Sequence, residues 1–191
     1  MRVFDASDKS VFDHVCGQLA DKVSESVGYP DIIIGIRSGG AHVASAVASR
    51  FPRSEVGYVI ARRPSTGGKK RFGVGTFLRY LPVRILDMLR IIEARVLARS
   101  GNPERQVTLE IPDNLLMRMK QPDTVVVVVD DAVDSGYTLQ AVLAALKPLT
   151  GGPLYTAAVT STVDSPVVAP DIMLYNDNTL VRFPWSMDAK R

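Results

Sequence analysis

A cluster of acidic and hydroxyl side chains directly follows the most apolar stretch of the sequence, and its composition suits a binding site. Five consecutive valines, residues 125–129, end in Asp130 and Asp131. Asp134 comes shortly afterwards, and it is followed by small or hydroxyl-bearing residues: Ser135, Gly136, Tyr137 and Thr138. Carboxylates accept hydrogen bonds from sugar hydroxyls, whereas hydroxyls and free backbone N–H groups at a helix start bind phosphate. A hydroxyl-binding site beside a phosphate-binding site predicts a sugar phosphate as the ligand.

The elements that must position these residues can be read from the sequence pattern. The valines are β-branched and predict a buried strand over residues 124–131, and a helix over residues 138–149 follows. Strands alternate with helices along the chain, which predicts an α/β fold with a parallel sheet and a ligand site at the carboxyl ends of its strands. Further strands are expected at residues 31–36, 56–61, 107–111, 154–161 and 171–175, and further helices at residues 8–26, 41–51, 77–99 and 113–120.

Other α/β proteins, response regulators among them, also carry a strand that ends in two acids, and such an Asp can simply cap a helix. The complete pattern is more specific: an apolar run, Asp-Asp, two apolar residues, Asp-Ser-Gly, any residue and Thr. It resembles the phosphoribosyl pyrophosphate (PRPP) signature of the type I phosphoribosyltransferases, in particular the purine (xanthine–guanine and hypoxanthine) type. That family usually has Thr where Ser135 stands, and Ser retains the hydroxyl. The resemblance implies a central, mostly parallel sheet flanked by helices, with a small hood.

The resemblance also implies roles for the residues of the motif. Asp130 and Asp131 would bind the ribose 2′- and 3′-hydroxyls, and Asp131 would help to hold Mg²⁺. The turn at residues 135–138 would bind the 5′-phosphate. In family members that use 6-oxopurines, an acid at the position of Asp134 lies beside the purine N7 and acts as general base or proton partner. Asp134 therefore favours a purine substrate.

A second element of the family, a loop for pyrophosphate, is expected after the strand at residues 31–36. The sequence there supplies one cation and two glycines within four residues: Arg37, Ser38, Gly39 and Gly40. The glycines allow backbone N–H groups to face a diphosphate, and Arg37 would neutralise it. Ser38 separates Arg37 from the glycines, whereas purine members usually place the basic residue next to them. A tight strand-to-helix turn without a ligand is the alternative.

Residues 62–75 are basic and rich in glycine, which predicts a mobile loop. The resemblance implies a catalytic loop that closes over the reacting centre and excludes water. Its cations would stabilise departing pyrophosphate: Arg62, Arg63, Lys69, Lys70 and Arg71. A solvated basic loop is the alternative. Residues 77–120 lie outside the resemblance, and we interpret them as a helical insertion that packs on the sheet or on a second subunit. A membrane-surface helix and an RNA-binding face are the competing interpretations.

The C-terminal end, residues 179–188, resembles the hood of bacterial xanthine–guanine phosphoribosyltransferases, which carries a Pro-Trp pair. Those enzymes stack an aromatic residue on the base and use an acid to read the purine amino group. The corresponding positions here are Leu180 and Arg182. Leu180 has no π-system, and Arg182 cannot accept a hydrogen bond, so the resemblance predicts a base other than guanine. Trp185 is expected to pack within the hood or to reach the base.

The overall composition bounds the other properties. The length of 191 residues fits one domain, 1–191, with a core over about residues 28–175 and a hood from residues 176–191 and part of the N-terminus. The net charge of +3 suits an anionic small substrate and is too weak to indicate nucleic acid. Cys16 lies in an apolar-periodic stretch, which predicts a core residue rather than a nucleophile. No apolar run is long enough for a membrane span, and the N-terminus lacks an apolar signal core, so a cytoplasmic location is expected.

Together these features predict a PRPP-dependent phosphoribosyltransferase of nucleotide metabolism. It would transfer 5-phosphoribose to a ring nitrogen of a nucleobase, with a 6-oxopurine as the favoured acceptor, and release pyrophosphate. Mg²⁺ is the expected cofactor, and family analogy predicts a homodimer. The departures at Ser38, Leu180 and Arg182 support a second hypothesis, a non-catalytic regulator that binds PRPP or a nucleotide. A scaffold that retains only the fold is the third.

Overall fold

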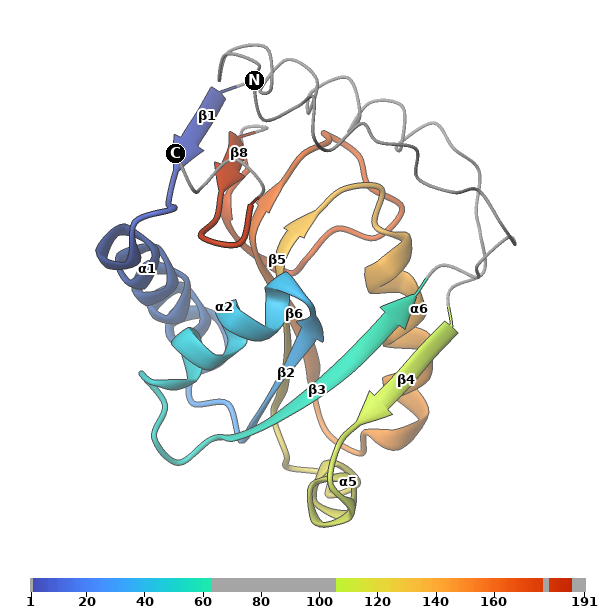
Figure 1. Ribbon diagram of the computed structural model, residues 1–191. Coiled ribbons are helices and arrows are strands. Elements are labelled where there is room, and N and C mark those ends of the chain that lie inside the picture. The colour runs from blue at the N-terminus through green and yellow to red at the C-terminus, as the bar shows by residue number, and fades with distance from the viewer. Residues whose placement is uncertain (1, 63–105, 177–178, 187–191) are drawn as a thin grey trace.

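The predicted fold class is confirmed, because the protein is built on a central, mostly parallel sheet flanked by helices (Figure 1). The computed structural model describes residues 2–62, 106–176 and 179–186. The sheet has the strand order β4-β3-β2-β5-β6-β7, and β4 alone runs antiparallel to its neighbour. The strand bounds are β2 Ile32–Arg37, β3 Glu55–Arg62, β4 Gln106–Glu110, β5 Val126–Val133, β6 Leu154–Ser161 and β7 Ile172–Tyr175.

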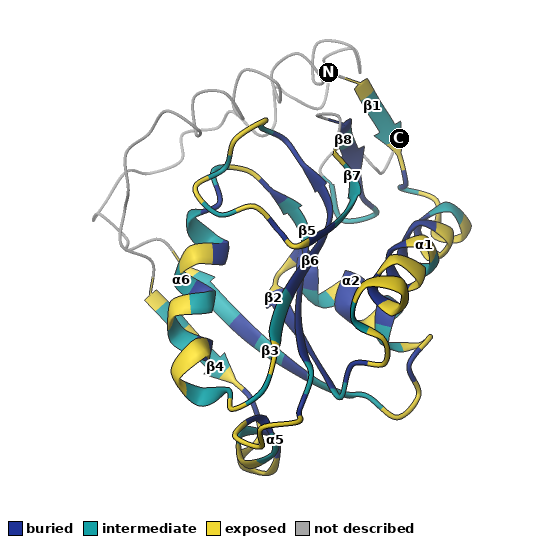
Figure 2. Cartoon of the chain, turned by 180° about the vertical axis from the view of Figure 1, so that it is seen from behind, coloured by how far each residue is buried: buried dark blue, intermediate teal, exposed yellow. Residues whose placement is uncertain are grey.

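Helices contribute to the core on both faces of this sheet (Figure 2). On one face lie α1 (Lys9–Val27) and α2 (Gly39–Ala48). The other core contains residues of α5 (Asp113–Met119) and α6 (Tyr137–Leu146). A short 3-10 helix, Lys147–Leu149, follows α6. None of the helices in the described ranges is long and apolar enough to cross a membrane.

Local signals in the sequence set the helix ends. The Asp8 side chain caps α1 by accepting hydrogen bonds from the N–H groups of Ser10 (2.8 Å) and Val11 (3.3 Å), and such a cap contributes about 1 kcal/mol. The helix ends at Gly28, whose φ of 76° is accessible to glycine without steric cost. The helix expected over residues 138–149 gives way to the 3-10 turn after Leu146, where Pro148 cannot donate a helical hydrogen bond.

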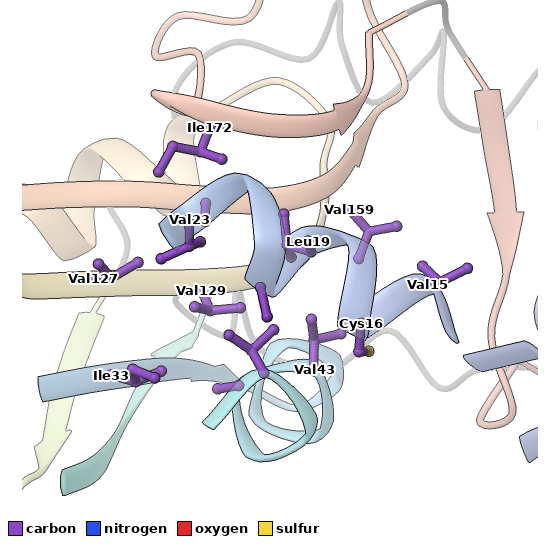
Figure 3. Close-up of a cluster of buried hydrophobic side chains, with 14 of the residues drawn as sticks. Val15, Cys16, Leu19, Val23, Ile33, Val43, Val127, Val129, Val159 and Ile172 are labelled. Atoms are coloured by element: carbon purple, nitrogen blue, oxygen red, sulfur yellow. The ribbon is translucent and has the colours of Figure 1, made fainter. Parts of the chain in front are cut away.

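The alternating side chains of β5 reach both hydrophobic cores. Val127 and Val129 pack with α1 and α2 in the first core (Figure 3), whereas Val126 and Val128 belong to the second core with α6. All four are fully buried, and full burial of a valine stabilises the fold by roughly 1.5 kcal/mol or more. The strand that carries the two acids is therefore held firmly from both sides.

Cys16 is confirmed as a core residue. It lies within α1 in the first core and is 1% exposed (Figure 3). Burial, with a smaller contribution from the charge of Asp13, raises the pKa of its thiol to about 12. A thiol with this pKa is not a nucleophile near neutral pH.

A separate two-stranded sheet joins the first and last described strands. In it β1 (Arg2–Asp5) pairs in parallel with β8 (Thr179–Arg182). The Ala6 N–H donates to the carbonyl of Arg182 at 2.8 Å, which continues the pairing by one step. The pairing with β1 thereby holds β8 in place, together with Phe183 and Trp185, which follow it.

The prediction for the strand at residues 124–131 was wrong at its ends, in a way that matters for the site. The strand β5 begins at Val126 and continues past the two acids to Val133, because β6 pairs with it along this whole length. The acids were predicted as the last two residues of the strand, whereas the strand continues for two residues beyond them. The strand and helix expected at residues 107–111 and 113–120 are confirmed as β4 and α5. The predicted helix at 77–99, and the predicted loop beyond Arg62, lie outside the described residues.

Candidate active site

The direction in which the chain adds strands to the sheet switches between β2 and β5. From β2 the chain proceeds to β3 on one side of the sheet, and from β5 it proceeds to β6 and β7 on the other side. The pairing of β2 with β5 ends at Gly35 and Val129, whereas β5 continues with β6 to Val133. Asp130 and Asp131 are the first residues of β5 beyond its pairing with β2. In open α/β sheets, ligands bind at such a switch in strand order.

The first turn of α2 packs directly against these two acids. A Cβ on Gly40 would lie 2.8 Å from the Cα of Asp130 and from its Oδ1 atom, and a Cβ on Gly39 would overlap the Asp131 carboxylate. Only glycine permits this approach. Because the first N–H groups of a helix have no intrahelical partner, the start of α2 presents backbone donors beside a pair of carboxylates, as the predicted pyrophosphate loop requires.

The two acids differ in their surroundings. Asp130 is 9% exposed, and its Oδ1 accepts a hydrogen bond from the backbone N–H of Asp131 at 3.0 Å. Desolvation by burial, and next the negative charge of Asp131, raise the pKa of Asp130 well above its usual value. Asp131 is half-buried, and its Oδ2 accepts a hydrogen bond from the indole N–H of Trp185 at 3.2 Å. Hydroxyl donors or a cation would relieve the unfavourable charge at this pair.

A sharp turn connects the acids to α6. Gly136 precedes the helix with φ 81°, and a Cβ there would meet the backbone N and O of Val168 at 2.7 Å. The Val167 N–H donates to the carbonyl of Ser135 at 2.9 Å, so the segment after β6 supports the turn from outside. Helix α6 starts at Tyr137 and Thr138, whose N–H groups lie in its first turn. The turn thus combines a helix N-terminus with the hydroxyl-bearing side chains predicted to bind phosphate.

Asp134 lies between the acid pair and this turn and is exposed. Its Oδ1 accepts a hydrogen bond from the Thr162 hydroxyl at 2.5 Å. Thr162 is buried, and its own N–H donates to the carbonyl of Val133 at 3.0 Å, which fixes it beside the end of β5. Thr162 was missed from the sequence because it lies 28 residues away in a segment without a recognisable motif.

A sequence model described as the phosphoribosyl transferase domain matches residues 8–160. The chain belongs to the phosphoribosyltransferase family. The match includes α1, the glycines of α2, the two acids and the phosphate turn. No curated protein sequence is similar enough to the chain to be counted as a relative.

Solved structures show the same fold at low sequence identity. A purine phosphoribosyltransferase from Pyrococcus horikoshii has a TM-score of 0.64 and 19% identity, covering 97% of this chain and 95% of that one. A xanthine–guanine–hypoxanthine phosphoribosyltransferase from Helicobacter pylori has 0.63 and 19%, covering 99% and 97%. A hypothetical protein from Neisseria gonorrhoeae with bound ppGpp has 0.60 and 15%, covering 99% and 93%. The chain therefore shares its fold with these proteins, two of which are purine phosphoribosyltransferases.

In this phosphoribosyltransferase the side chain of Arg37 is directed to β4 and β3. Its Nε lies 2.9 Å from Glu110 Oε2, and its guanidinium lies 5.2 Å from the ring centre of Tyr58. The peptide bond between Arg37 and Ser38 is cis. Arg37 was expected to neutralise pyrophosphate, and in this structure its side chain forms a half-exposed ion pair with Glu110. Glu110 belongs to no recognisable motif, so the sequence did not predict its ion pair with Arg37.

The predicted hood residues have separate environments. Leu180 is half-buried in β8. Arg182 is 8% exposed, and its Nη1 donates to Asp5 Oδ2 at 2.8 Å, so its charge is directed to β1. Of the predicted base-binding residues, Trp185 contacts the acid pair, through its hydrogen bond to Asp131. Four of the five predicted loop cations lie outside the described residues: Arg63, Lys69, Lys70 and Arg71. The fifth, Arg62, was predicted to lie in the loop but is the last residue of β3, where it pairs with β4.

Proposed function

We propose that the protein transfers 5-phosphoribose from PRPP to a ring nitrogen of a 6-oxopurine and releases pyrophosphate. One observation supports this most strongly. An accessible carboxylate, Asp134, lies between a pair of acids suited to ribose hydroxyls and a helix start suited to a phosphate. A purine bound above the ribose would place its N7 beside this carboxylate. The carboxylate would then accept the proton that the base loses on bonding to the ribose.

Different residues bind the different groups of PRPP. The turn at residues 135–138 binds the 5′-phosphate through hydroxyls and the start of α6. Asp130 and Asp131 accept hydrogen bonds from the ribose hydroxyls, and the first turn of α2 donates to the diphosphate. The bond between C1′ and pyrophosphate breaks as the base nitrogen bonds to C1′. Positive charge develops on the ribose ring, so fixed orientation and nearby carboxylates stabilise the transition state.

The acid pair also fits Mg²⁺. Hard carboxylate oxygens are suitable ligands, and this ion is usually held by one or two carboxylates together with substrate phosphates. Asp131, which is half-buried and is oriented by the hydrogen bond from Trp185, is the proposed ligand. When bound, Mg²⁺ would neutralise charge on the departing diphosphate.

The choice of a 6-oxopurine rests on Asp134 and on the purine activities named for the Pyrococcus and Helicobacter proteins. The test is pyrophosphate release from PRPP and Mg²⁺ with hypoxanthine, guanine, xanthine, adenine, uracil or orotate. Release with hypoxanthine or xanthine is expected. Asp134→Asn should reduce turnover while PRPP binding, measured by calorimetry, persists. Release with a pyrimidine alone would refute the purine assignment.

A second candidate is a non-catalytic regulator that binds PRPP or a nucleotide. It is favoured by the engagement of Arg37 with Glu110 and of Arg182 with Asp5, which directs both cations to protein acids. The Neisseria protein of similar fold contains bound ppGpp. PRPP or nucleotide binding without pyrophosphate release for any base would support this candidate.

We further propose a cytoplasmic homodimer, which rests on the family resemblance. Of the insertion predicted over residues 77–120, the part proposed for the subunit contact is the predicted helix at 77–99, because β4 and α5 pack within the subunit. Analytical ultracentrifugation with and without anionic liposomes tests both points. A dimer that does not sediment with liposomes is expected, and liposome binding would instead support the membrane-surface interpretation.

A further inference from the structure

The Trp185 side chain is carried by a turn that two hydrogen bonds close. The N–H of Ser186 donates to the carbonyl of Phe183 at 2.9 Å, and the N–H of Phe183 donates to the Ser186 hydroxyl at 3.0 Å. The turn directly follows β8. Because β8 is paired with β1, the position of Trp185 is set by both ends of the chain.

Aromatic rings from three different parts of the chain surround the indole. Phe183 stacks on it with a centroid distance of 4.9 Å, His42 of α2 stacks at 4.8 Å, and Phe12 of α1 meets it edge-on at 5.4 Å. Each such pair contributes about 0.5–1.5 kcal/mol beyond its burial when it is well packed. The orientation of the ring, and hence the direction of its N–H bond, is therefore fixed.

That N–H bond is directed at Asp131. The Nε1–Oδ2 distance is 3.2 Å, and the same carboxylate lies against the backbone of Gly39 at the start of α2. Asp131 is thus positioned from two sides, by the hood and by the predicted pyrophosphate loop. An unrestrained Asp carboxylate samples several rotamers, and selecting one of them before the ligand arrives lowers the entropy cost of binding.

We propose that Trp185 is a positioning residue for PRPP, which holds the Asp131 carboxylate in the orientation that accepts a ribose hydroxyl and Mg²⁺. This inference rests on the proposed function, since it takes Asp131 as a PRPP-binding group. It goes beyond both roles considered for Trp185, packing within the hood and contact with the base, because Trp185 acts here through a carboxylate and affects PRPP rather than the base.

The test is a double-mutant cycle that measures PRPP binding by calorimetry in the presence of Mg²⁺. Trp185→Phe keeps an aromatic ring and removes the N–H donor. It is expected to weaken PRPP binding by about fivefold to tenfold, which is less than the full value of a hydrogen bond to a charged group, because the lost bond orients Asp131 and does not itself contact PRPP. In an Asp131→Asn background, the same replacement should have less than about a twofold effect, because the charged acceptor is already gone. Phe12→Leu, which alters the packing around the indole but leaves its N–H in place, is the matched control.

Thermal unfolding separates positioning from simple loss of structure. Trp185→Phe should unfold within a few degrees of the wild type, and Phe12→Leu should lower the unfolding temperature more while changing the PRPP affinity less. The inference is overturned if Trp185→Phe binds PRPP as tightly as the wild type, or if it weakens binding by the same factor in the Asp131→Asn background as in the wild type. Failure of the wild type itself to bind PRPP would instead refute the proposed function.

Trp185 also supplies a second readout, since the chain has one tryptophan. A ligand that engages Asp131 changes the hydrogen-bond partner of the fluorophore, so PRPP with Mg²⁺ should change the emission of the wild type. Asp131→Asn should remove most of this change at the same ligand concentration. Emission that does not respond to saturating PRPP, in a protein that calorimetry shows to bind it, would contradict the contact between Trp185 and the ligand-binding carboxylate.

Discussion

Replacing each glycine of the α2 start by alanine should separate the stability of the fold from the function of the site. A Cβ on Gly40 would lie 2.8 Å from the Cα of Asp130 and from the carbonyl oxygen of Val129, both in the backbone of β5. Carbon atoms in contact prefer about 3.5–4.0 Å, so α2 must move away from the sheet. The three atoms nearest to a Cβ on Gly39 all belong to the side-chain carboxylate of Asp131, which can change its rotamer.

The magnitudes follow from this difference. Forcing a methyl group into a packed position costs about 1–3 kcal/mol, and alanine in place of glycine in a helix returns up to about 1 kcal/mol. Gly40→Ala should therefore lose about 1–2 kcal/mol of stability, and its unfolding temperature should fall by roughly 2–8 °C for a chain of this size. Gly39→Ala should stay within about 1 kcal/mol of the wild type, because the helical gain offsets the displaced carboxylate.

PRPP binding should show the opposite order, with the larger loss in Gly39→Ala. Displacing Asp131 removes hydrogen bonds from ribose hydroxyls to a charged group, each of which is worth about 1.5 kcal/mol or more. Gly39→Ala should therefore weaken PRPP binding at least about tenfold. The assays are thermal unfolding by circular dichroism and calorimetric titration with PRPP and Mg²⁺. Gly39→Ala with unchanged PRPP affinity would refute the reasoning, and so would equal losses of stability in the two variants.

Two further predictions concern the acids. Burial raises the pKa of Asp130. Between the unfolded and folded pKa values of this group, the folded state binds more protons than the unfolded state, so the stability of the wild type falls as the pH rises. Asp130→Asn should therefore unfold at a higher temperature than the wild type at pH 7, and the difference between the two unfolding temperatures should narrow toward pH 4. A difference that is absent at pH 7 or widens on acidification in calorimetric scans would contradict this. Thr162→Val removes the hydroxyl that donates to Asp134, so it should lower kcat about tenfold with little change in the Kd for PRPP, whereas Thr162→Ser should retain activity. Equal kcat values for the Val and Ser variants in the pyrophosphate-release assay would exclude this role for the hydroxyl.

The sequence was sufficient to predict the central sheet and to identify the contiguous residues of the candidate site. Buried parallel strands read as unbroken apolar runs, which is why residues 31–36 and 154–161 were assigned almost residue by residue. The acid pair and the phosphate turn lie within nine residues of one another, so a local pattern describes them completely. The end of β5 was misjudged because an acid usually marks a strand end, whereas pairing with β6 carries this strand through both acids to Val133.

The remaining features of the site depend on contacts between distant segments. The hydrogen bonds of Asp131 with Trp185 and of Asp134 with Thr162 join residues 54 and 28 positions apart. No periodicity or motif specifies such pairs, because they follow from how the helices and loops pack at the sheet edge. The same holds for Arg37, whose sequence position suited pyrophosphate but whose Nε lies 2.9 Å from an acid on another strand.

The departure at Arg182 from the purine enzymes acquires a structural explanation in this arrangement. Its guanidinium is almost fully buried and pairs with Asp5 at 2.8 Å, and the pKa of Asp5 is lowered to about 2 by its hydrogen bonds with Ser7 and, in smaller part, by Arg182. An acid at position 182 would face Asp5 with like charge. Arg182 thus strengthens the pairing of β1 with β8, which carries the turn of Trp185. A residue that reads the base in related enzymes would here hold the hood in place, and through Trp185 the hood would act on the ribose-binding acid rather than on the base.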